Sequence, residues 1–220
     1  MGIFDIMGPI MIGPSSSHTA GAAKIGYYAY RIYDKEFNEV EIHLYNSFAD
    51  TGKGHGTDKA VVAGLLGIRP DDERIIDSLR TAEERGIKVK FFYHHDIEQH
   101  SKLVQIVFLG SEPTQISGIS TGGGKIKIIE MNGAKIEFEG KHETLVIILN
   151  DAPGIFGFIT TLLGNEKINI AYLNAVRDAE TERALSLLKL DAHCPDHVIA
   201  KICEDPNIIK VTRIEKIKFD

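Results

Sequence analysis

The final third of the chain alternates short apolar strands with helices, and this order limits the possible fold more than any other feature of the sequence. Four segments have the length and composition of strands. Two others have helical spacing, and the first of these opens at Pro153, a residue favoured in the first turn of a helix. The predicted strands span 144–150, 168–177, 183–191 and 208–217, and the predicted helices span 152–167 and 195–205. The result is β-α-β-β-α-β, which is the ferredoxin-like order.

The preceding part of the chain predicts a second unit of mixed helices and strands. Residues 19–33 have small side chains on one face and apolar side chains at helical spacing, which indicates a helix. Residues 39–49 alternate as a half-buried strand does, and the glycines that follow predict a loop before a helix that Gly67 ends. The remaining predictions are a helix closed by Gly86, strands at 88–94 and 103–109, and a glycine loop feeding one more strand within 120–130.

The composition is that of a soluble globular protein, since 43% of the residues are hydrophobic and 25% are charged. Turns at Asn132-Gly133 and at Gly140 favour two domains, 1–140 and 143–220. The formal net charge of -6 argues against a nucleic-acid partner, because such affinity comes mostly from Lys and Arg that neutralise phosphates. The fold class that follows is α+β.

Two cysteines, Cys194 and Cys203, bear on both location and metal chemistry. The sequence shows no secretory signal, so we expect a cytoplasmic protein with reduced thiols. No apolar run approaches the ~20 residues that span a bilayer, so we expect no membrane association. Two thiols are too few for an iron–sulfur cluster that needs four, and no CxxC pair suggests zinc. We therefore expect no metal ligated by this chain, and another chain would have to hold any cluster.

Two segments of the first domain place hydroxyls or glycines and one imidazole directly before a predicted helix. They are GPSSSHT at 13–19 and GKGHGT at 52–57. Free backbone N–H groups and the positive end of the helix dipole favour anions at such a place, so a carboxylate or a phosphate is the expected guest. One hydroxyl of the first segment would cap its helix. His18 and His55 would then stand beside the bound acid.

Other interpretations of these segments stay open. A glycine-rich turn before a helix is often plain turn chemistry, in which Thr57 or Asp58 caps the helix. The second segment is not a P-loop, because Lys53 lies inside the glycine run rather than after it. A third segment, STGGGKI at 120–126, would let the backbone approach a ligand closely through its successive glycines.

Three further histidines, His94, His95 and His100, cluster in the stretch YHHDIEQHSK. Metal binding is one interpretation of this cluster. A solvated loop is the favoured one, because the histidines and the few carboxylates of the stretch have no regular spacing.

The motifs IGPSSSHTAGAAKIG, NSFADTGKGHGTDKAVVAGLLGI and STGGGKI, in this order, resemble the beta subunits of the two-chain, iron–sulfur-dependent bacterial L-serine dehydratases. The resemblance covers nearly the whole chain. It implies a lyase subunit that works with an alpha subunit to convert L-serine into pyruvate and ammonia without pyridoxal phosphate. It further implies a [4Fe–4S] cluster in the alpha subunit, whose unligated iron acts as a Lewis acid on the serine hydroxyl. The first domain would resemble the allosteric substrate-binding domain of some phosphoglycerate dehydrogenases.

The resemblance also implies roles for the two histidine-bearing segments. His55 is the expected base that removes the α-proton, with His18 second, because an imidazole has a pKa near neutrality. The residues expected to bind substrate or to organise the loops are Ser15, Ser16, Ser17, Thr19, Gly54, Gly56, Thr57, Gly122 and Gly123.

Residues 143–220 resemble an ACT domain through the stretch NDAPGIFGFITTLLGNEKINIAYLNAVR. ACT domains usually pair and bind amino acids at their mutual interface, which implies a homodimer formed through this domain. The implied regulatory amino-acid site consists of Asn150, Asp151, Pro153 and Gly154. Where ACT sequences often carry a glycine between the second and third strands, this chain has RDAETERA.

One departure concerns His100-Ser101-Lys102, where family members commonly carry His-Pro-Asn. If that asparagine contacts substrate, its replacement alters substrate preference. Two other classes of function stay open. One is a regulatory amino-acid sensor with no catalytic task, and the other is a phosphate-binding regulatory module in which the histidines are incidental.

Overall fold

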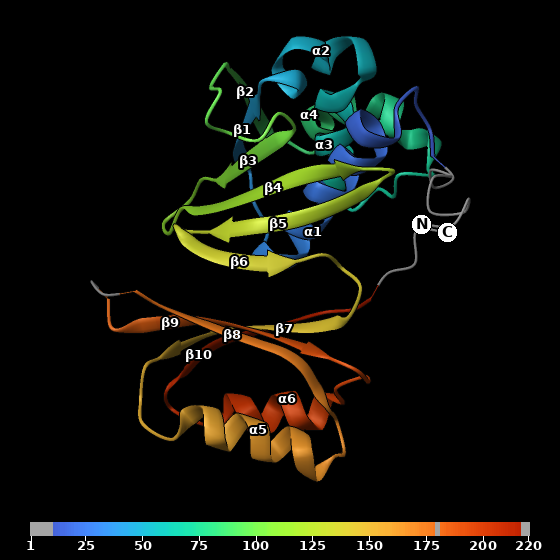
Figure 1. Ribbon diagram of the computed structural model, residues 1–220. Helices are drawn as coiled ribbons and strands as arrows, with labels where there is room; N and C mark the ends of the chain where they lie inside the picture. The colour runs from blue at the N-terminus through green and yellow to red at the C-terminus, as the bar shows by residue number, and fades with distance from the viewer. Residues whose placement is uncertain (1–10, 179–180, 217–220) are drawn as a thin grey trace. The chain divides into compact units, whose positions relative to one another are not determined.

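The structure is a computed structural model that describes residues 11–178 and 181–216 (Figure 1). It divides the chain into two compact units, which meet along the sequence near Gly140. Unit 1 holds most of the chain before this point, and unit 2 holds most of the chain after it. Each unit combines helices with one sheet, which confirms the predicted α+β class. None of the helices in the described ranges is both long and apolar enough to cross a membrane.

Unit 1 is built on a six-stranded sheet. Its strands are β1 (Glu39–Tyr45), β2 (Lys88–His94), β3 (Leu103–Phe108), β4 (Thr114–Gly122), β5 (Lys125–Met131) and β6 (Ala134–Phe138). The order across the sheet is β2-β1-β3-β4-β5-β6, with β1 and β2 parallel and the pairs β1–β3, β3–β4 and β4–β5 antiparallel. β1 buries Val40, Ile42 and Leu44 on one face, as its alternation predicts.

The strand β6 occupies the segment that the turns at Asn132-Gly133 and Gly140 assigned to the domain boundary. Asn132 and Gly133 have positive φ values of 48° and 79°, so they form a tight hairpin turn that returns the chain to the sheet. The sequence did not predict this strand, because an Asn-Gly pair occurs both in hairpin turns and in turns between domains.

Two helices of unit 1, α1 (Gly21–Tyr33) and α3 (Thr57–Leu65), pack closely against each other, and α1 also packs on β3, β4 and β5. Their close approach depends on glycine. A Cβ atom at Gly64 would lie 2.1 Å from the carbonyl oxygen of Ala23, and one at Gly26 would lie 2.2 Å from that of Val61. The predicted helix with a face of small side chains is confirmed, and those small side chains set the distance between the two helices.

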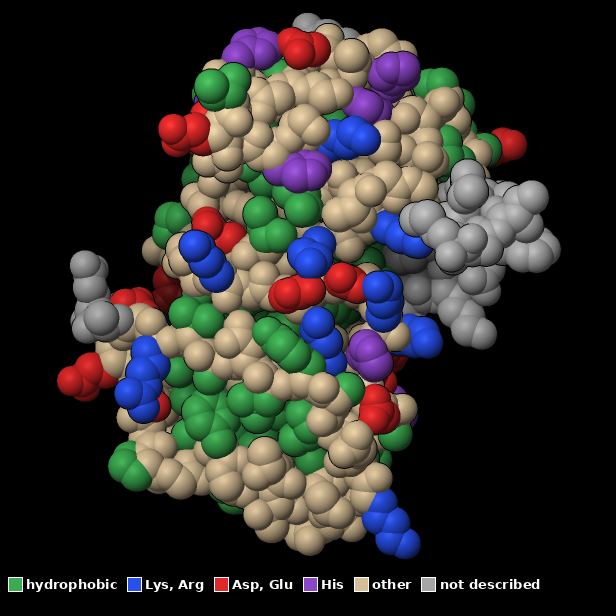
Figure 2. Space-filling model, viewed as in Figure 1, with side chains coloured by type: hydrophobic (Ala, Val, Ile, Leu, Met, Phe, Trp, Pro, Cys, Tyr) green, Lys and Arg blue, Asp and Glu red, His purple; other side chains and the backbone are tan. Residues whose placement is uncertain are grey.

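Two segments that the sequence predicts as irregular are helical. Ser47–His55 form the helix α2, where the sequence predicts the end of a strand and then a glycine loop. Ser16–Ala20 form a π-helical turn, η2, which leads into α1, so helical structure begins before Thr19. Glycine costs about 1 kcal/mol in a helix relative to alanine. Burial of Phe48 and Gly52 offsets that cost in α2. Figure 2 shows histidine side chains gathered at the end of unit 1 where α2 lies.

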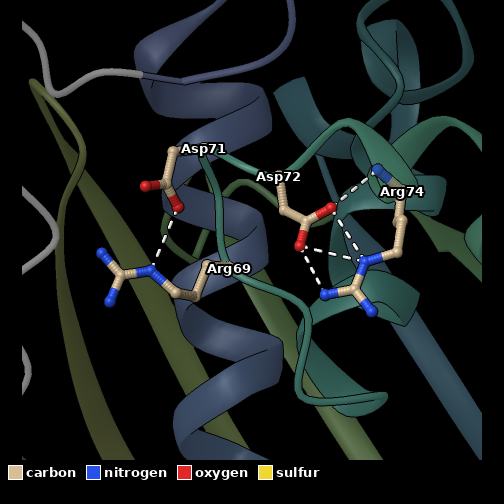
Figure 3. A network of polar contacts seen from close by, with 4 residues as sticks. All are labelled: Arg69, Asp71, Asp72 and Arg74. Atoms are coloured by element: carbon tan, nitrogen blue, oxygen red, sulfur yellow. Dashed lines mark hydrogen bonds and ion pairs between the residues drawn. The ribbon is translucent and has the colours of Figure 1, made fainter.

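The segment before β2 holds a 3-10 turn, η3 (Glu73–Asp77), and a short helix, α4 (Ser78–Glu84), where one continuous helix was predicted. Asp72 caps η3, because its carboxylate accepts hydrogen bonds from the backbone N–H of Arg74 at 2.9 Å and from its Nε at 3.0 Å (Figure 3). The side-chain and backbone hydrogen bonds from Arg74 lower the pKa of Asp72 to about 2. Asp72 therefore marks the residue at which the helical segment begins.

Unit 2 contains, in chain order, β7 (Glu143–Asn150), α5 (Ile155–Asn165), β8 (Ile170–Asp178), β9 (Arg183–Leu190), α6 (Asp196–Cys203) and β10 (Ile208–Ile214). Its sheet has the order β10-β7-β9-β8, and all three neighbouring pairs are antiparallel. This arrangement confirms the predicted ferredoxin-like order. The helix α5 begins after Gly154, which has a φ of 87°, rather than at Pro153. The core joins both helices to the sheet through Leu145, Ile147, Ile159, Leu163, Leu188, Val198 and Ile202.

Candidate functional site

Two histidines from different segments of unit 1 lie side by side. His18 belongs to η2 and His55 ends α2, and their ring centroids are 5.1 Å apart. A hydrogen bond joins the two segments, because the hydroxyl of Thr19 donates to the backbone carbonyl oxygen of His55 at 3.0 Å. The structure therefore brings together the two histidines that the sequence singles out.

Both ring nitrogens of His18 are held by serine hydroxyls. Nε2 lies 3.0 Å from Oγ of Ser47, the first residue of α2. Nδ1 lies 3.0 Å from Oγ of Ser17 and 3.3 Å from Oγ of Ser15. The ring also meets Phe48 edge to face, at a centroid distance of 5.1 Å. A hydroxyl can donate or accept, so these contacts fix the position of the ring in either neutral tautomer.

The environment of His18 disfavours its charged form. Burial lowers its pKa from the ordinary value of 6.5, and the positive charges of His55 and Lys102 lower it further. The neutral imidazole is therefore favoured at neutral pH. A neutral imidazole can accept a proton, which is the state that proton transfer to this residue requires.

The hydroxyl-rich segment caps its own helical turn. Ser15 precedes η2, and its Oγ accepts the backbone N–H of His18 at 3.1 Å. Gly13 has a φ of +127°, and a Cβ atom there would lie 2.5 Å from Cγ2 of Thr19, so glycine lets the chain fold over the turn. The predicted single cap is confirmed. The predicted row of side chains in front of the helix is wrong, because the residues after Ser15 lie inside the first helical turn.

The glycine-rich segment breaks one helix and starts the next. Gly56 separates α2 from α3 with a φ of 66°, a left-handed conformation that glycine adopts without strain. The prediction that Thr57 or Asp58 caps α3 is wrong, because Gly56 is the N-cap and no side chain makes a capping hydrogen bond. The predicted loop with free N–H groups is therefore reduced to the single turn at Gly56.

Three buried polar atoms have no hydrogen-bond partner among the residues that the structure describes: Nδ1 of His55, Oγ1 of Thr57 and Oγ of Ser120. Thr57 follows His55 closely in the chain. Ser120 packs against Gly21, the first residue after η2. A buried polar group without a partner costs about 1–3 kcal/mol. A ligand that supplies the missing hydrogen bonds would recover this free energy, so the three atoms favour a binding site here.

The remaining predicted site residues surround this arrangement. The carbonyl oxygen of Ser16 accepts the N–H of Gly21 inside the helical turn. Gly54 is exposed beside His55. Gly122 ends β4 and Gly123 begins the turn to β5, with φ values of 95° and 58°. Their roles in substrate binding stay predictions.

Residues 2–127 match the family model for the serine dehydratase beta chain. The chain belongs to the serine dehydratase beta chain family. A probable L-serine dehydratase beta chain of Bacillus subtilis (strain 168) is 38% identical over 96% of this chain and 97% of its own length. The L-serine dehydratase beta chain of Peptoniphilus asaccharolyticus is 40% identical over 86% of each chain. A D-3-phosphoglycerate dehydrogenase of Bacillus subtilis (strain 168) is 24% identical over 88% of this chain and 37% of its own. The resemblance of the three motifs to L-serine dehydratase beta chains is thus confirmed.

Two polar residues of this serine dehydratase beta chain family member affect His18 but were not predicted to do so. Ser47 contacts His18 from the start of α2. Lys102, directly before β3, lowers the pKa of His18 through its charge. Ser47 gives a signal in the sequence, since it is a hydroxyl residue soon after a buried strand, where functional side chains are often placed.

The other clustered histidines make separate contacts. Nε2 of His94 lies 2.9 Å from Nδ1 of His43, and Nδ1 of His95 lies 3.4 Å from a carboxylate oxygen of Asp50. Nδ1 of His100 accepts the N–H of Lys102 at 3.1 Å. Residues 11–178 and 181–216 contain no group of three or more His, Cys, Asp or Glu side chains that could hold a metal ion.

The two cysteines do not fit the ligand set of an iron–sulfur cluster. Cys194 is buried in the core of unit 2, where burial raises the pKa of its thiol to about 11. Cys203 is exposed at the end of α6. Cluster iron is bound by several thiolates, and a thiol with this pKa stays protonated at neutral pH.

The residues predicted for a regulatory amino-acid site lie in the turn between β7 and α5. The N–H of Asn150 donates to the carbonyl oxygen of Asn207 at 2.8 Å. The carboxylate of Asp151 pairs with Nε of Arg177 at 2.6 Å. The turn continues through Pro153 to Gly154, the N-cap of α5. Ligand binding by this turn stays a prediction.

Proposed function

We propose that this chain is the beta subunit of an L-serine dehydratase, an L-serine ammonia-lyase that forms pyruvate and ammonia together with an alpha subunit. The observation that carries the proposal is the pairing of His18 and His55 at a centroid distance of 5.1 Å among serine hydroxyls. Family membership supports it. The relative that is 38% identical is named a probable L-serine dehydratase beta chain, and the relative that is 40% identical is named an L-serine dehydratase beta chain.

The reaction removes the α-proton and the β-hydroxyl of serine. We assign removal of the proton to His55, because its Nδ1 is buried and has no partner within the described ranges. An imidazole suits this task, since its ordinary pKa is close to the working pH. Both ring nitrogens of His18 are instead held by serines. His18 is therefore the second candidate, and its neutral ring is placed to bind the substrate beside His55.

The residues that the sequence predicts to bind substrate or to organise the loops divide into two groups. Ser15, Ser17 and Thr19 organise the site, because they contact the His18 ring or the His55 carbonyl oxygen. We assign substrate contacts to Thr57, whose Oγ1 has no partner among the described residues, and to backbone that lacks a Cβ atom. The glycines of this group are Gly54, Gly56, Gly122 and Gly123. We also assign a substrate contact to Ser16, which lies in η2 beside His18.

We place the metal chemistry in the alpha subunit. A [4Fe–4S] cluster held there would supply a Lewis acid that assists departure of the substrate hydroxyl. The protonated, buried thiol of Cys194 supports this placement. Free cysteines also support a cytoplasmic location.

Reconstitution tests the proposal. The purified chain is mixed with a cluster-bearing alpha chain, and pyruvate formation from L-serine is measured for the mixture and for each chain alone. We expect turnover by the mixture and none by this chain alone. Turnover by this chain alone would refute the subunit assignment. Binding of L-serine by the mixture without turnover would identify an amino-acid sensor instead.

We also propose that two copies of the chain pair through unit 2. β8 is an edge strand of its sheet, and its side chains Tyr172 and Leu173 are 37% and 41% exposed. An edge strand with exposed apolar side chains is suited to pairing with another strand. Light scattering should show a dimer for the native chain and a monomer for Leu173→Asp, and an unchanged mass in this variant would contradict pairing through β8.

A further inference from the structure

Lys102 lies on a segment next to the one that carries His18. Its carbonyl oxygen accepts the backbone N–H of Ser120 at 3.1 Å, so Lys102 borders β4. Ser120 in turn packs against the start of α1, since a Cβ atom at Gly21 would lie 2.5 Å from its Oγ. Gly21 directly follows η2, which contains His18. Ser120 of β4 therefore links Lys102 to the end of η2.

The loop that ends at Lys102 is tied to the same strand end that positions His18. The side-chain amide of Asn46 donates to the carbonyl oxygens of Asp96 and Gln99 at 2.7 and 3.2 Å, and its Oδ1 accepts the N–H of Asp96 at 2.8 Å. Asn46 directly precedes Ser47, which contacts His18. The loop and the imidazole are thus anchored at neighbouring residues.

Lys102 is half-buried as a residue, and its side chain forms no ion pair with any residue in 11–178 or 181–216. The positive charge of Lys102 contributes to the lowered pKa of His18, after burial and the neighbouring His55. Next to Lys102, the hydroxyl of Ser120 is buried and has no partner within the described part of the chain. A cation without a carboxylate partner and a hydroxyl without a hydrogen bond are the groups that a bound carboxylate would satisfy.

We propose that Lys102 binds the α-carboxylate of the amino-acid substrate and thereby determines specificity for a ligand with a free carboxylate. This inference rests on the proposed function and deepens it. Removal of the α-proton is easier when the negative charge of the adjacent carboxylate is neutralised. The ammonium group would supply that neutralisation, with Ser120 as a hydrogen-bond donor to the same carboxylate.

The test compares two ligands that differ in this one group. L-serine and L-serinamide, in which a neutral amide replaces the carboxylate, are titrated calorimetrically into the complex of this chain with its alpha chain. Lys102→Met should weaken L-serine binding by about 10- to 100-fold, as expected for a charge-assisted hydrogen bond. Binding of L-serinamide should change by less than about twofold, and Lys102→Arg should restore most of the affinity for L-serine.

A matched lysine controls for loss of surface charge. Lys88 is exposed at the start of β2, the end of that strand away from His94, and Lys88→Met should leave both affinities unchanged. An equal loss of affinity for both ligands in Lys102→Met would assign the residue a structural role and overturn the inference. Unchanged affinity for both ligands would also overturn the inference. Pyruvate formation by the native complex is measured separately. Its absence would refute the dehydratase assignment, while the ratio of the two affinities still decides the role of Lys102.

Discussion

The imidazole of His18 is contacted by serine hydroxyls and is influenced by the charge of Lys102, and its environment disfavours protonation. The pKa of His18 in the folded chain is consequently below 6.5, first because of burial and then because of His55 and Lys102. The unfolded chain takes up this proton more readily than the folded chain does. The stability that neutral His18 contributes is therefore fully present above pH 6.5 and is lost as the pH falls toward the lowered pKa.

Nuclear magnetic resonance can follow this titration through the ring protons of His18. We expect a midpoint below 6.5 in the folded chain, whereas the peptide GPSSSHTAG should titrate near 6.5. Lys102→Met should raise the midpoint, because it removes a positive charge that lowers the pKa of His18. Lys88→Met is the control and should leave it unchanged. A midpoint at or above that of the peptide would show that the ring is not enclosed as described.

The residue scale also shows what the sequence can and cannot predict about the site. His18 and His55 could be singled out because each lies in a segment rich in hydroxyls or glycine. The hydrogen bond from Ser47 to His18 could not be predicted, because it depends on where β1 ends relative to η2. The buried hydroxyl of Ser120, which has no hydrogen-bond partner among the described residues, could not be predicted either, since no sequence pattern marks a strand serine as buried and unpartnered.

At the scale of elements, the crossing of α1 and α3 holds the two motifs together. η2 continues into α1, and His55 lies just before α3, so any change in the distance between these helices moves both histidines. Gly64 sits where α3 meets the backbone of α1, with Ala23 O 2.1 Å and Tyr27 N 2.4 Å from the position of a Cβ atom. The crossing leaves no room for a methyl group.

Gly64→Ala should therefore lower the free energy of unfolding by about 1–3 kcal/mol, the usual cost of overpacking. Urea denaturation followed by circular dichroism measures this change. Gly157→Ala is the matched control, since Gly157 lies in α5 with no atom within 4 Å of a Cβ position. It should be neutral or more stable by up to ~1 kcal/mol, because alanine favours helices. Equal effects of the two substitutions would rule out a close crossing.

Element prediction succeeded where the apolar pattern was regular. β1 has clean alternation, and the order of elements in unit 2 follows from its repeated apolar runs. It failed at α2, where Gly52 and Gly54, closely followed by Gly56, suggest a loop although Ser47–His55 are helical. Local propensity was overridden there by packing, since Gly52 is buried against Leu44 and Thr57.

At the scale of the whole molecule, the chain consists of two units with separate cores. The first carries the histidine pair, and the second has the ferredoxin-like order. The α+β class and the family could both be predicted from the sequence, because the three motifs are long and the apolar runs are regular. A cluster-bearing partner could be inferred only from the resemblance and the cysteine count, since no arrangement of residues within one chain specifies a second chain.

We propose that the histidine pair of this chain performs proton transfer for a reaction whose cluster is held by a partner. The most direct test is pyruvate formation from L-serine by the reconstituted two-chain enzyme with His55→Ala, measured when the visible absorbance shows an intact cluster. Loss of a general base typically costs 10²- to 10⁴-fold, so we expect turnover to fall by at least ~100-fold. Retention of most of the turnover in this variant would contradict the account.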